Sequence, residues 1–532
     1  MPQSPKKQSF LHGTILLTAA TAIVKVIGAL YKLPLNAIIG PEGFGYFNTA
    51  YDIYNVLLMI STAGLPVAMS RMISQASSLG HYRQVRKIYS TAKGIFLGLG
   101  LVGSLLMTLF CKQLAAFQEQ PDAWAAIGAL GPCCFFICLM STYRGFFQGQ
   151  SNMLPTSVSQ VLEAICKLIV GIGAAVLVYK LTASIPYAAG GAILGVTASC
   201  LLSSIYLGSV FGKAYKELPV TDEPVSSRKD IAKGLLLIAV PITIGSAGLQ
   251  ILTMLETKIY MEQLKTFLTQ DAANIQKGIY NMTQTIFNMP CAFITPITIS
   301  IIPAITAQLT TGEIRGAKAT EESAARVTAL ISAPCAVGLA VLAQPVTALL
   351  GGYSGENLAL ATQLMGVLGL CILFNATVLL TNAIMQAHGH VTLPVVNMFV
   401  GGILKLIAIS ILTRNPHIGI LGAPIGTLLC YLSITLLNLI SLRRAVEQTP
   451  AIVKNMLRAV LSAAIMGAAV YGTWYGLTAA LGSDMSRIIA CGVPLIAGVA
   501  VYALCAVKLK AITREDCMLL PKGERIAHIL HL

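Results

Sequence analysis

The sequence predicts an all-α integral membrane protein with about 14 transmembrane helices: two six-helix lobes related by a parallel repeat, plus two C-terminal helices. Two observations carry the fold class. The 532 residues are 55% hydrophobic and only 11% charged, with a mean hydropathy of +0.75, whereas a soluble protein carries roughly 25% charged residues. The apolar runs are about 20–28 residues long, which suits membrane-crossing helices and not the short alternating strands of a barrel.

Hydropathy gives the order of the predicted spans along the chain. They lie near residues 13–38, 46–74, 88–111, 122–148, 155–180, 186–211, 232–262, 275–310, 322–350, 358–387, 392–413, 419–442, 454–479 and 485–508. The longest polar stretch separates the sixth span from the seventh. The expected domains are an N-terminal lobe at 1–211, a cytoplasmic linker at 212–231, a C-terminal lobe at 232–442, and two extra transmembrane helices with a cytoplasmic tail at 443–532.

The net charge of +15 could indicate a nucleic-acid partner, but the basic residues are scattered through short loops between spans. With the N-terminus inside, the cytoplasmic ends and loops hold about 25 of the 36 Lys and Arg residues, as the positive-inside rule requires. Both termini are therefore predicted to be cytoplasmic, and no nucleic acid is expected as a partner. The first apolar stretch is too long for a cleavable signal and is expected to be retained as a span.

An internal repeat supports the two-lobe prediction. The segment "RGFFQGQSNMLPTSVSQVLEAICKLIVGIGAAVLV" matches "NAIMQAHGHVTLPVVNMFVGGILKLIAISILT", with Gln148 on Gln386 and Lys167 on Lys405. The shift is about 238 residues. Each unit contains an even number of spans, so both enter the membrane in the same orientation, as in transporters that work by alternating access.

Two lysines of the first span are candidates for substrate binding. Lys25 and Lys32 lie seven residues apart, so two helical turns return them to nearly the same face. Lys25 lies near mid-membrane, where exposure to lipid is costly, and a water-filled cavity is favoured over a structural ion pair. Lys32 lies closer to the outer interface, so snorkelling remains equally open.

Polar stripes on two counterpart spans predict facing walls of one cavity, with hydrogen bonding between helices as the alternative. The stripe of the second span is Asn48, Asp52 and Asn55, and that of the eighth span is Asn281, Gln284 and Asn288. Lys405 is a further candidate for substrate binding because it has no acid one turn away, but for the pair of Lys405 and its counterpart Lys167 a structural role is slightly favoured. For its counterpart Lys167 we expect an ion pair with Glu163. Arg144 could anchor a headgroup or capture phosphate.

No enzyme signature, cofactor site or metal site is expected. The sequence contains no Walker A motif, no Ser/His/Asp set and no paired acids, and "GLGLVG" lies inside an apolar span, where it predicts close helix packing. The 13 cysteines lie mostly within spans without zinc spacing, which indicates packing residues.

The first two spans, "KVIGALYKLPLNAIIGPEGFGYFNTAYDIYNVLLMISTAGLPVAMSRMIS", with the "FFQGQSNMLPT" turn, resemble the polysaccharide-transporter branch of the MATE-like (MOP) exporters. Within it, the sequence is most similar to the stage V sporulation protein B group and the MurJ (MviN)-like lipid II flippases. The resemblance implies movement of undecaprenyl-diphosphate-linked sugars from the inner to the outer leaflet of the bacterial cytoplasmic membrane. It also places Lys25 and Lys32 where cations hold the pyrophosphate, and makes the last two helices part of a groove for the lipid tail.

The expected function is therefore a flippase for a lipid-linked cell-wall precursor, lipid II or a related oligosaccharide. A diphosphate carries about two negative charges, which lysines in a low-dielectric cavity favour, whereas cation export would need buried carboxylates. Expected partners are the polyprenyl-diphosphate-linked saccharide, membrane lipids, and the cell-wall synthesis or sporulation machinery. Asp52 is a candidate for ion coupling. The alternative is a MATE-type drug or organic-cation antiporter.

Overall fold

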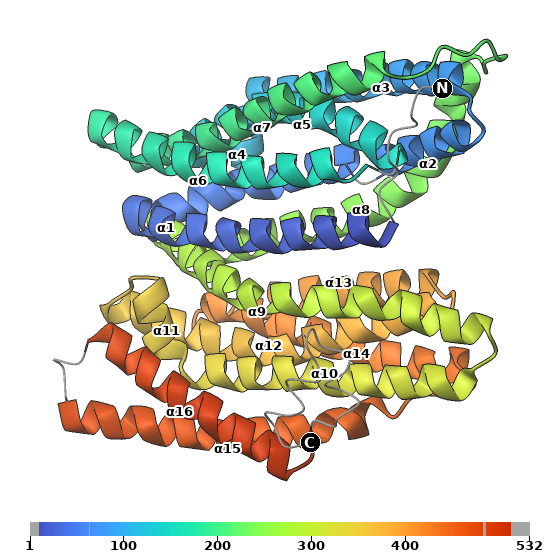
Figure 1. The fold of residues 1–532 in the computed structure, drawn as a ribbon. Coiled ribbons are helices and arrows are strands. Elements are labelled where there is room, and N and C mark those ends of the chain that lie inside the picture. Colours follow the sequence, from blue (N-terminus) through green and yellow to red (C-terminus); the bar gives the residue numbers. More distant parts are fainter. Residues whose placement is uncertain (1–9, 63, 151, 482–485, 512–532) are drawn as a thin grey trace. The chain divides into compact units, whose positions relative to one another are not determined.

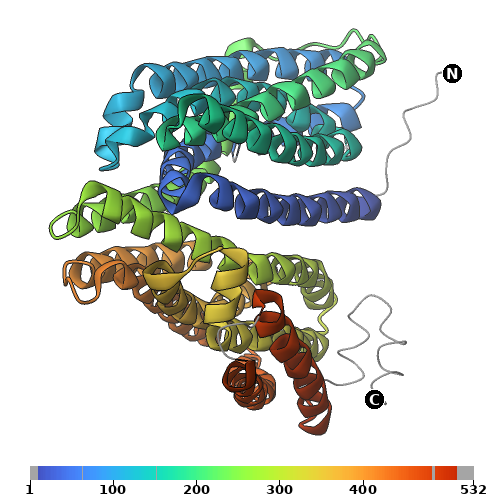
Figure 2. The ribbon, with the colours of Figure 1, turned by 90° about the vertical axis from the view of Figure 1, so that its left-hand side faces the viewer.

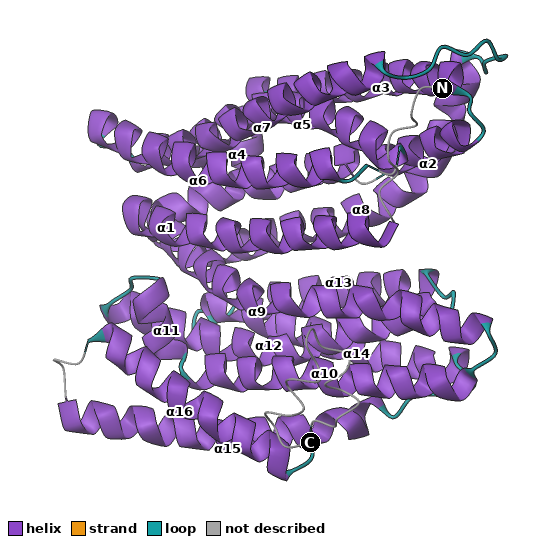
Figure 3. Cartoon of the chain, viewed as in Figure 1, coloured by secondary structure: helices purple, strands orange, loops and turns teal. Residues whose placement is uncertain are grey.

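The computed structural model describes residues 10–62, 64–150, 152–481 and 486–511, apart from some side chains within these ranges. Throughout them the regular secondary structure is helical, with no strand (Figure 3). The chain divides into two compact units, which we call unit 1 (Met1–Gly278) and unit 2 (Ile279–Leu532). The all-α fold class expected from the sequence is confirmed.

The helices are long and follow one another with short connections (Figure 1). Those that begin in unit 1 are α1 (Phe10–Thr62), α2 (Leu65–Ser78), α3 (Tyr82–Leu109), α4 (Cys111–Phe117), the short 3₁₀ helix η1 (Pro121–Ala123), α5 (Trp124–Gly149), α6 (Leu154–Thr182), α7 (Ile185–Lys216), α8 (Arg228–Leu264) and α9 (Gln270–Thr310). Unit 2 continues with α10 (Ile314–Val341), α11 (Ala343–Leu350), α12 (Gly355–Ala387), α13 (Thr392–Leu412), η2 (Gly419–Leu421), α14 (Gly422–Ala445), α15 (Ile452–Leu481) and α16 (Arg487–Lys508).

Helix α1 is broken into two arms at Gly40, which has φ 69° and ψ 176°. Only glycine adopts such a backbone conformation readily, because it has no Cβ. Pro41 follows directly and suits the first turn of the second arm. The first arm corresponds to the first predicted span, and the second arm with α2 corresponds to the second.

Unit 1 is held together by helices that approach closely. Helix α3 packs on α5, α5 on α7, α6 on α7 and α1 on α6. At the contact between α6 and α7, a Cβ added to Gly195 would lie 2.2 Å from Cα of Gly171. Small residues at this contact let the two backbones come together. The resulting bundle is seen from two directions in Figures 1 and 2.

Unit 2 repeats the same packing order. Helix α10 packs on α12, α12 on α14 and α13 on α14, in the order in which α3, α5, α7 and α6 pack in unit 1. Lys167 on α6 and Lys405 on α13 therefore occupy corresponding helices, as the sequence repeat predicts. Helix α15 lies outside this pattern, packed on α10 and on α16.

The division between the units falls at Gly278, inside α9. Helix α8 belongs to unit 1 because it packs on α1, α2 and α3, so the division comes after α8. The sequence repeat would instead divide the chain in the polar linker at 212–231, and these lobe boundaries remain a prediction. The connection between α7 and α8 covers residues 217–227, and its Asp222 accepts a hydrogen bond from the Arg83 guanidinium at 2.8 Å.

Among the described residues, ten helices are long and apolar enough to cross a membrane. Together with the two arms of α1 and the long helices α8 and α9, they account for the about 14 spans expected from the sequence. The protein is a multi-pass membrane protein.

Candidate functional site

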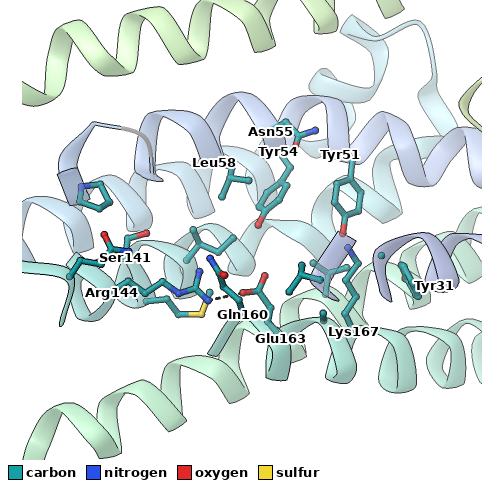
Figure 4. Close-up of a pocket in the computed structure, with 18 of the residues that line it drawn as sticks. Tyr31, Tyr51, Tyr54, Asn55, Leu58, Ser141, Arg144, Gln160, Glu163 and Lys167 are labelled. Carbon is teal, nitrogen blue, oxygen red and sulfur yellow. Dashed lines mark hydrogen bonds and ion pairs between the residues drawn. The ribbon is translucent and has the colours of Figure 1, made fainter. Parts of the chain in front are cut away.

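A cavity of about 490 Å³ with polar and apolar walls lies inside unit 1, bordered by α1, α2, α5, α6 and α7. The polar and aromatic residues that line it are Tyr31, Tyr51, Tyr54, Asn55, Ser141, Arg144, Gln148, Gln160, Glu163 and Lys167. All of them except Gln148 are labelled in Figure 4. Apolar side chains such as Leu58, Ile137 and Val196 complete the wall. A cavity of this size with convergent polar groups is a candidate binding site.

Helical spacing explains how the cavity becomes polar. Residues at i, i+3 and i+7 share one face of a helix. Helix α6 uses this spacing to present Gln160, Glu163 and Lys167. Helix α5 uses it to present Ser141, Arg144 and Gln148. In Figure 4, Tyr51 and Tyr54 of α1 point toward these groups.

Arg144 and Glu163 form an ion pair within the cavity wall. Nη2 of Arg144 donates to Oε2 of Glu163 at 3.0 Å, and the two side chains are 19% and 29% exposed. Nε of Arg144 also donates to Oγ of Ser159 at 3.1 Å. The guanidinium is therefore fixed by two partners on α6.

Lys167 lies between two aromatic rings. Its Nζ is 5.2 Å from the ring centroid of Tyr31 and 5.0 Å from that of Tyr51, distances that suit cation–π attraction. The Tyr31 ring is held in place because its hydroxyl donates to the Ala192 carbonyl at 3.1 Å. Lys167 forms no ion pair and no hydrogen bond with the described residues.

Glu163 thus pairs with Arg144 of the neighbouring helix, whereas the sequence predicts a pair with Lys167 one turn away. The physical reason is that the guanidinium reaches the carboxylate across the contact between α5 and α6, while the ammonium turns to the tyrosine rings. Sequence spacing shows which groups share a helix face, but it does not identify partners on other helices.

In the described part of the chain, two polar atoms of the lining are buried without a protein partner, Oη of Tyr51 and Oε1 of Gln160. Buried polar atoms are nearly always hydrogen-bonded to protein, water or a ligand. Among the described lining residues, Arg144 and Lys167 are opposed by Glu163 alone, which leaves an excess of positive charge. The arrangement can therefore bind an anion that also carries hydrogen-bonding groups.

The predicted residues of the first two spans occupy different environments. Asn55 lines the cavity. The Asn48 amide is buried and donates to the Phe44 carbonyl at 2.7 Å, one turn back on the same helix. Lys32 is half-buried, with Nζ 6.0 Å from the Phe44 ring centroid, and is an electrostatic neighbour of Lys167. The side chain of Lys25 lies outside the described residues.

Asp52 belongs to a second polar cluster in unit 1. Its Oδ2 lies 3.7 Å from Nζ of Lys277 and accepts a hydrogen bond from Oγ1 of Thr257 at 3.0 Å. Lys277 is fully buried and also donates to Oγ1 of Thr49 at 2.6 Å. Thr49 in turn donates to Gln120. We call Thr49, Asp52, Gln120, Thr257 and Lys277 the Asp52–Lys277 cluster.

Several residues of these two sites are absent from the sequence-based expectations. Tyr31, Tyr51, Tyr54 and Gln160 lack a distinguishing sequence signal, since their partners lie on other helices. Lys277 has such a signal, a lone cation just inside an apolar segment, of the kind that singles out Lys25.

The remaining candidates lie in unit 2. On α9, Asn281 is half-buried with Nδ2 lacking a partner, Gln284 is half-buried and Asn288 is exposed. Lys405 is half-buried on α13. That this stripe faces the stripe of α1 remains a prediction. No group of three or more potential metal ligands occurs among the described residues.

Comparison with solved structures identifies the fold. The chain is similar to the inward closed conformation of the lipid II flippase MurJ, with a TM-score of 0.69 and 14% identity over 93% of this chain and 98% of that one. It is also similar to an inward-facing multidrug resistance MATE family transporter of the MOP superfamily, with a TM-score of 0.63 and 15% identity over 81% of this chain and 94% of that one. The fold is the MurJ and MATE transporter fold.

A family model described as "Polysaccharide biosynthesis protein" matches residues 10–308. The chain belongs to this family. It is 25% identical to the uncharacterized membrane protein YabM of Bacillus subtilis over 99% of this chain and 97% of that protein. It is also 25% identical to the lipid II flippase MurJ of B. subtilis, over 94% and 95%, and 26% identical to stage V sporulation protein B of B. subtilis, over 81% and 83%. The resemblance drawn from the sequence is confirmed.

Proposed function

We propose that the protein is a flippase that moves a polyprenyl-diphosphate-linked saccharide, lipid II or a related cell-wall oligosaccharide, across the bacterial cytoplasmic membrane. The carrying observation is Lys167, a cation in a membrane-embedded cavity without a carboxylate or hydrogen-bond partner among the described residues. A charge within the membrane is costly and marks a functional site. The diphosphate of the cargo is the partner that Lys167 lacks.

Charge favours this cargo over the cation of an antiporter. A diphosphate brings about two negative charges, and attraction strengthens as the surroundings become less polar than water. The only carboxylate that lines the cavity of unit 1 among the described residues is Glu163, and Arg144 already holds it. An organic cation would meet two positive groups and no available acid.

The uncharged lining suits the saccharide that follows the diphosphate. Tyr51 and Tyr54 offer ring faces, and Asn55, Gln148 and Gln160 offer amides for sugar hydroxyl and acetamido groups. The polyprenyl tail stays in the lipid, along α15 and α16 in this proposal. Both helices carry many exposed apolar side chains, including Leu461, Ile465, Ile496 and Val499.

Transport proceeds by alternating access of the two repeats and requires no covalent chemistry. In this scheme both termini are cytoplasmic, the headgroup enters from the inner leaflet, and reorientation releases it outside. Asp52 remains a candidate for ion coupling, because its cluster with Lys277 joins α1 to α8 and α9. The relatives described as a lipid II flippase and a sporulation protein support the choice of cargo.

Complementation tests the proposal. The gene is expressed in a bacterium depleted of its own lipid II flippase, as wild type, Lys167→Ala or Lys180→Ala. Lys180 is the matched control because it lies on the same helix, is exposed and does not line the cavity. We expect growth with wild type and Lys180→Ala, and failure with Lys167→Ala at equal membrane abundance. Drug efflux that depends on Lys167, without complementation, would establish the antiporter instead.

A further inference from the structure

Glu163 is a carboxylate in a cavity whose other charged lining residues, Arg144 and Lys167, attract anions. Its Oε2 lies 3.0 Å from Nη2 of Arg144. Its other oxygen, Oε1, lies 4.0 Å from Sγ of Cys200, and a thiol is a weak donor. The ion pair with Arg144 is therefore the main attachment of the carboxylate, and a stronger anion could replace it.

Arg144 does not need Glu163 to stay in place. Nε of Arg144 donates to Oγ of Ser159, and Ser159 is fixed by donating to the Thr156 carbonyl at 2.7 Å. A guanidinium carries five N–H donors in a planar fork that suits two oxygens of a phosphate at once. Only Ser159 and Glu163 accept from Arg144 among the described residues. If the carboxylate moves away, the same fork is ready for a phosphate.

Glu163 also attracts Lys167 through space, without forming an ion pair with it. The two residues are one turn apart on α6, and their charges interact. A diphosphate brought to Lys167 and Arg144 would lie beside this carboxylate, and like charges that share a site repel. Substrate and Glu163 therefore compete for the same two cations.

We infer that Glu163 is an exchangeable internal counter-ion, which pairs with Arg144 in the unloaded cavity, offsets part of the nearby positive charge, and is displaced from Arg144 by the diphosphate of the cargo. This inference rests on the proposed function and adds that Glu163 sets the affinity of the cavity for the diphosphate of the cargo. The carboxylate limits the strength of diphosphate binding, so that the cargo can leave on the other side. When it leaves, Glu163 returns to Arg144.

Binding to the purified full-length protein in detergent tests the inference. The probe is farnesyl diphosphate, with farnesol to measure the contribution of the apolar chain. Wild type is compared with Glu163→Gln and, in case the amide disturbs folding, with Glu163→Ala. The control is Glu119→Gln, which removes the carboxylate of another partly buried ion pair of unit 1, the one with Lys265 at 2.7 Å.

We expect Glu163→Gln to bind farnesyl diphosphate about tenfold more tightly than wild type, a gain typical of removing one nearby like charge. Farnesol binding and the Glu119→Gln variant should match wild type, and Glu163→Gln should translocate more slowly because release is slower. Unchanged or weaker diphosphate binding by both Glu163 variants would overturn the inference. If Lys167→Ala still weakens binding in that case, the proposed function stands and only the counter-ion role fails. If wild type binds no diphosphate, both fail.

Discussion

Two lysines of unit 1 have opposite surroundings, the fully buried Lys277 and the half-buried Lys167. Lys277 has no exposed side-chain surface, lies 3.7 Å from Asp52 and donates to Thr49. Lys167 lines a cavity and has only the rings of Tyr31 and Tyr51 as close partners among the described residues. Both satisfy the sequence criterion of a cation inside an apolar helix. The comparison teaches that burial of a charge does not by itself identify a binding site, and that a cavity-lining cation without a carboxylate in contact does.

The largest difference should appear in stability. Lys277→Ala leaves Asp52 in a mostly buried position without its counter-charge, and removing one partner of a buried ion pair typically costs about 3–5 kcal/mol. Lys167→Ala removes two cation–π contacts, each typically worth about 0.5–2 kcal/mol, and also removes a charge that has no carboxylate in contact. We therefore expect a large fall in the apparent unfolding temperature for Lys277→Ala and a small change for Lys167→Ala. Equal falls would contradict the distinction between the two lysines.

Removing both charges of the Asp52–Lys277 pair gives a second contrast with Lys167. Replacing both partners of a buried ion pair by apolar residues often leaves the stability unchanged or raises it by about 1–4 kcal/mol. The double variant Asp52→Leu with Lys277→Met should therefore recover most of the stability that Lys277→Ala loses. Full translocation activity in the stable double variant would exclude ion coupling through Asp52. The measurements are thermal unfolding in detergent and complementation.

Two asparagines of one predicted stripe should behave differently. Asn55 lines the cavity, and Asn48 is bonded to the Phe44 carbonyl of its own helix. Asn48→Ala should lower stability by about 1 kcal/mol, the usual net value of one hydrogen bond, and leave transport intact. Asn55→Ala should reduce transport by about fivefold, the equivalent of one such bond to the headgroup. The reverse pattern would place the site on the other side of α1.

The smallest effect is expected at Lys32. It is half-buried beside the Phe44 ring and is an electrostatic neighbour of both Lys167 and Asp52. Because it does not line the cavity, Lys32→Ala should change diphosphate affinity by only about twofold to threefold, the scale of a weak long-range charge effect. A loss as large as that of Lys167→Ala would move the diphosphate toward Lys32.

The sequence predicts the fold well because span length, hydropathy and the repeat are local or additive signals. The break at Gly40 and the repeated order of helix packing agree with that prediction. The site is predicted only in part. Glu163 lies one turn from Lys167, yet it pairs with Arg144 from another helix, and no spacing rule along α6 reveals which helix will lie opposite. Lys277 shows the same limit, because its partner Asp52 is far away in the chain.

The central claim is that Lys167 holds the diphosphate of the cargo. The most direct measurement is translocation of a polyprenyl-diphosphate-linked saccharide by the purified protein in liposomes, for wild type, Lys167→Ala and Lys167→Arg. We expect the alanine variant to lose at least about tenfold in rate, which corresponds to about 1.4 kcal/mol, and the arginine variant to recover much of that loss because it keeps the charge. Translocation by Lys167→Ala at the wild-type rate would contradict the claim.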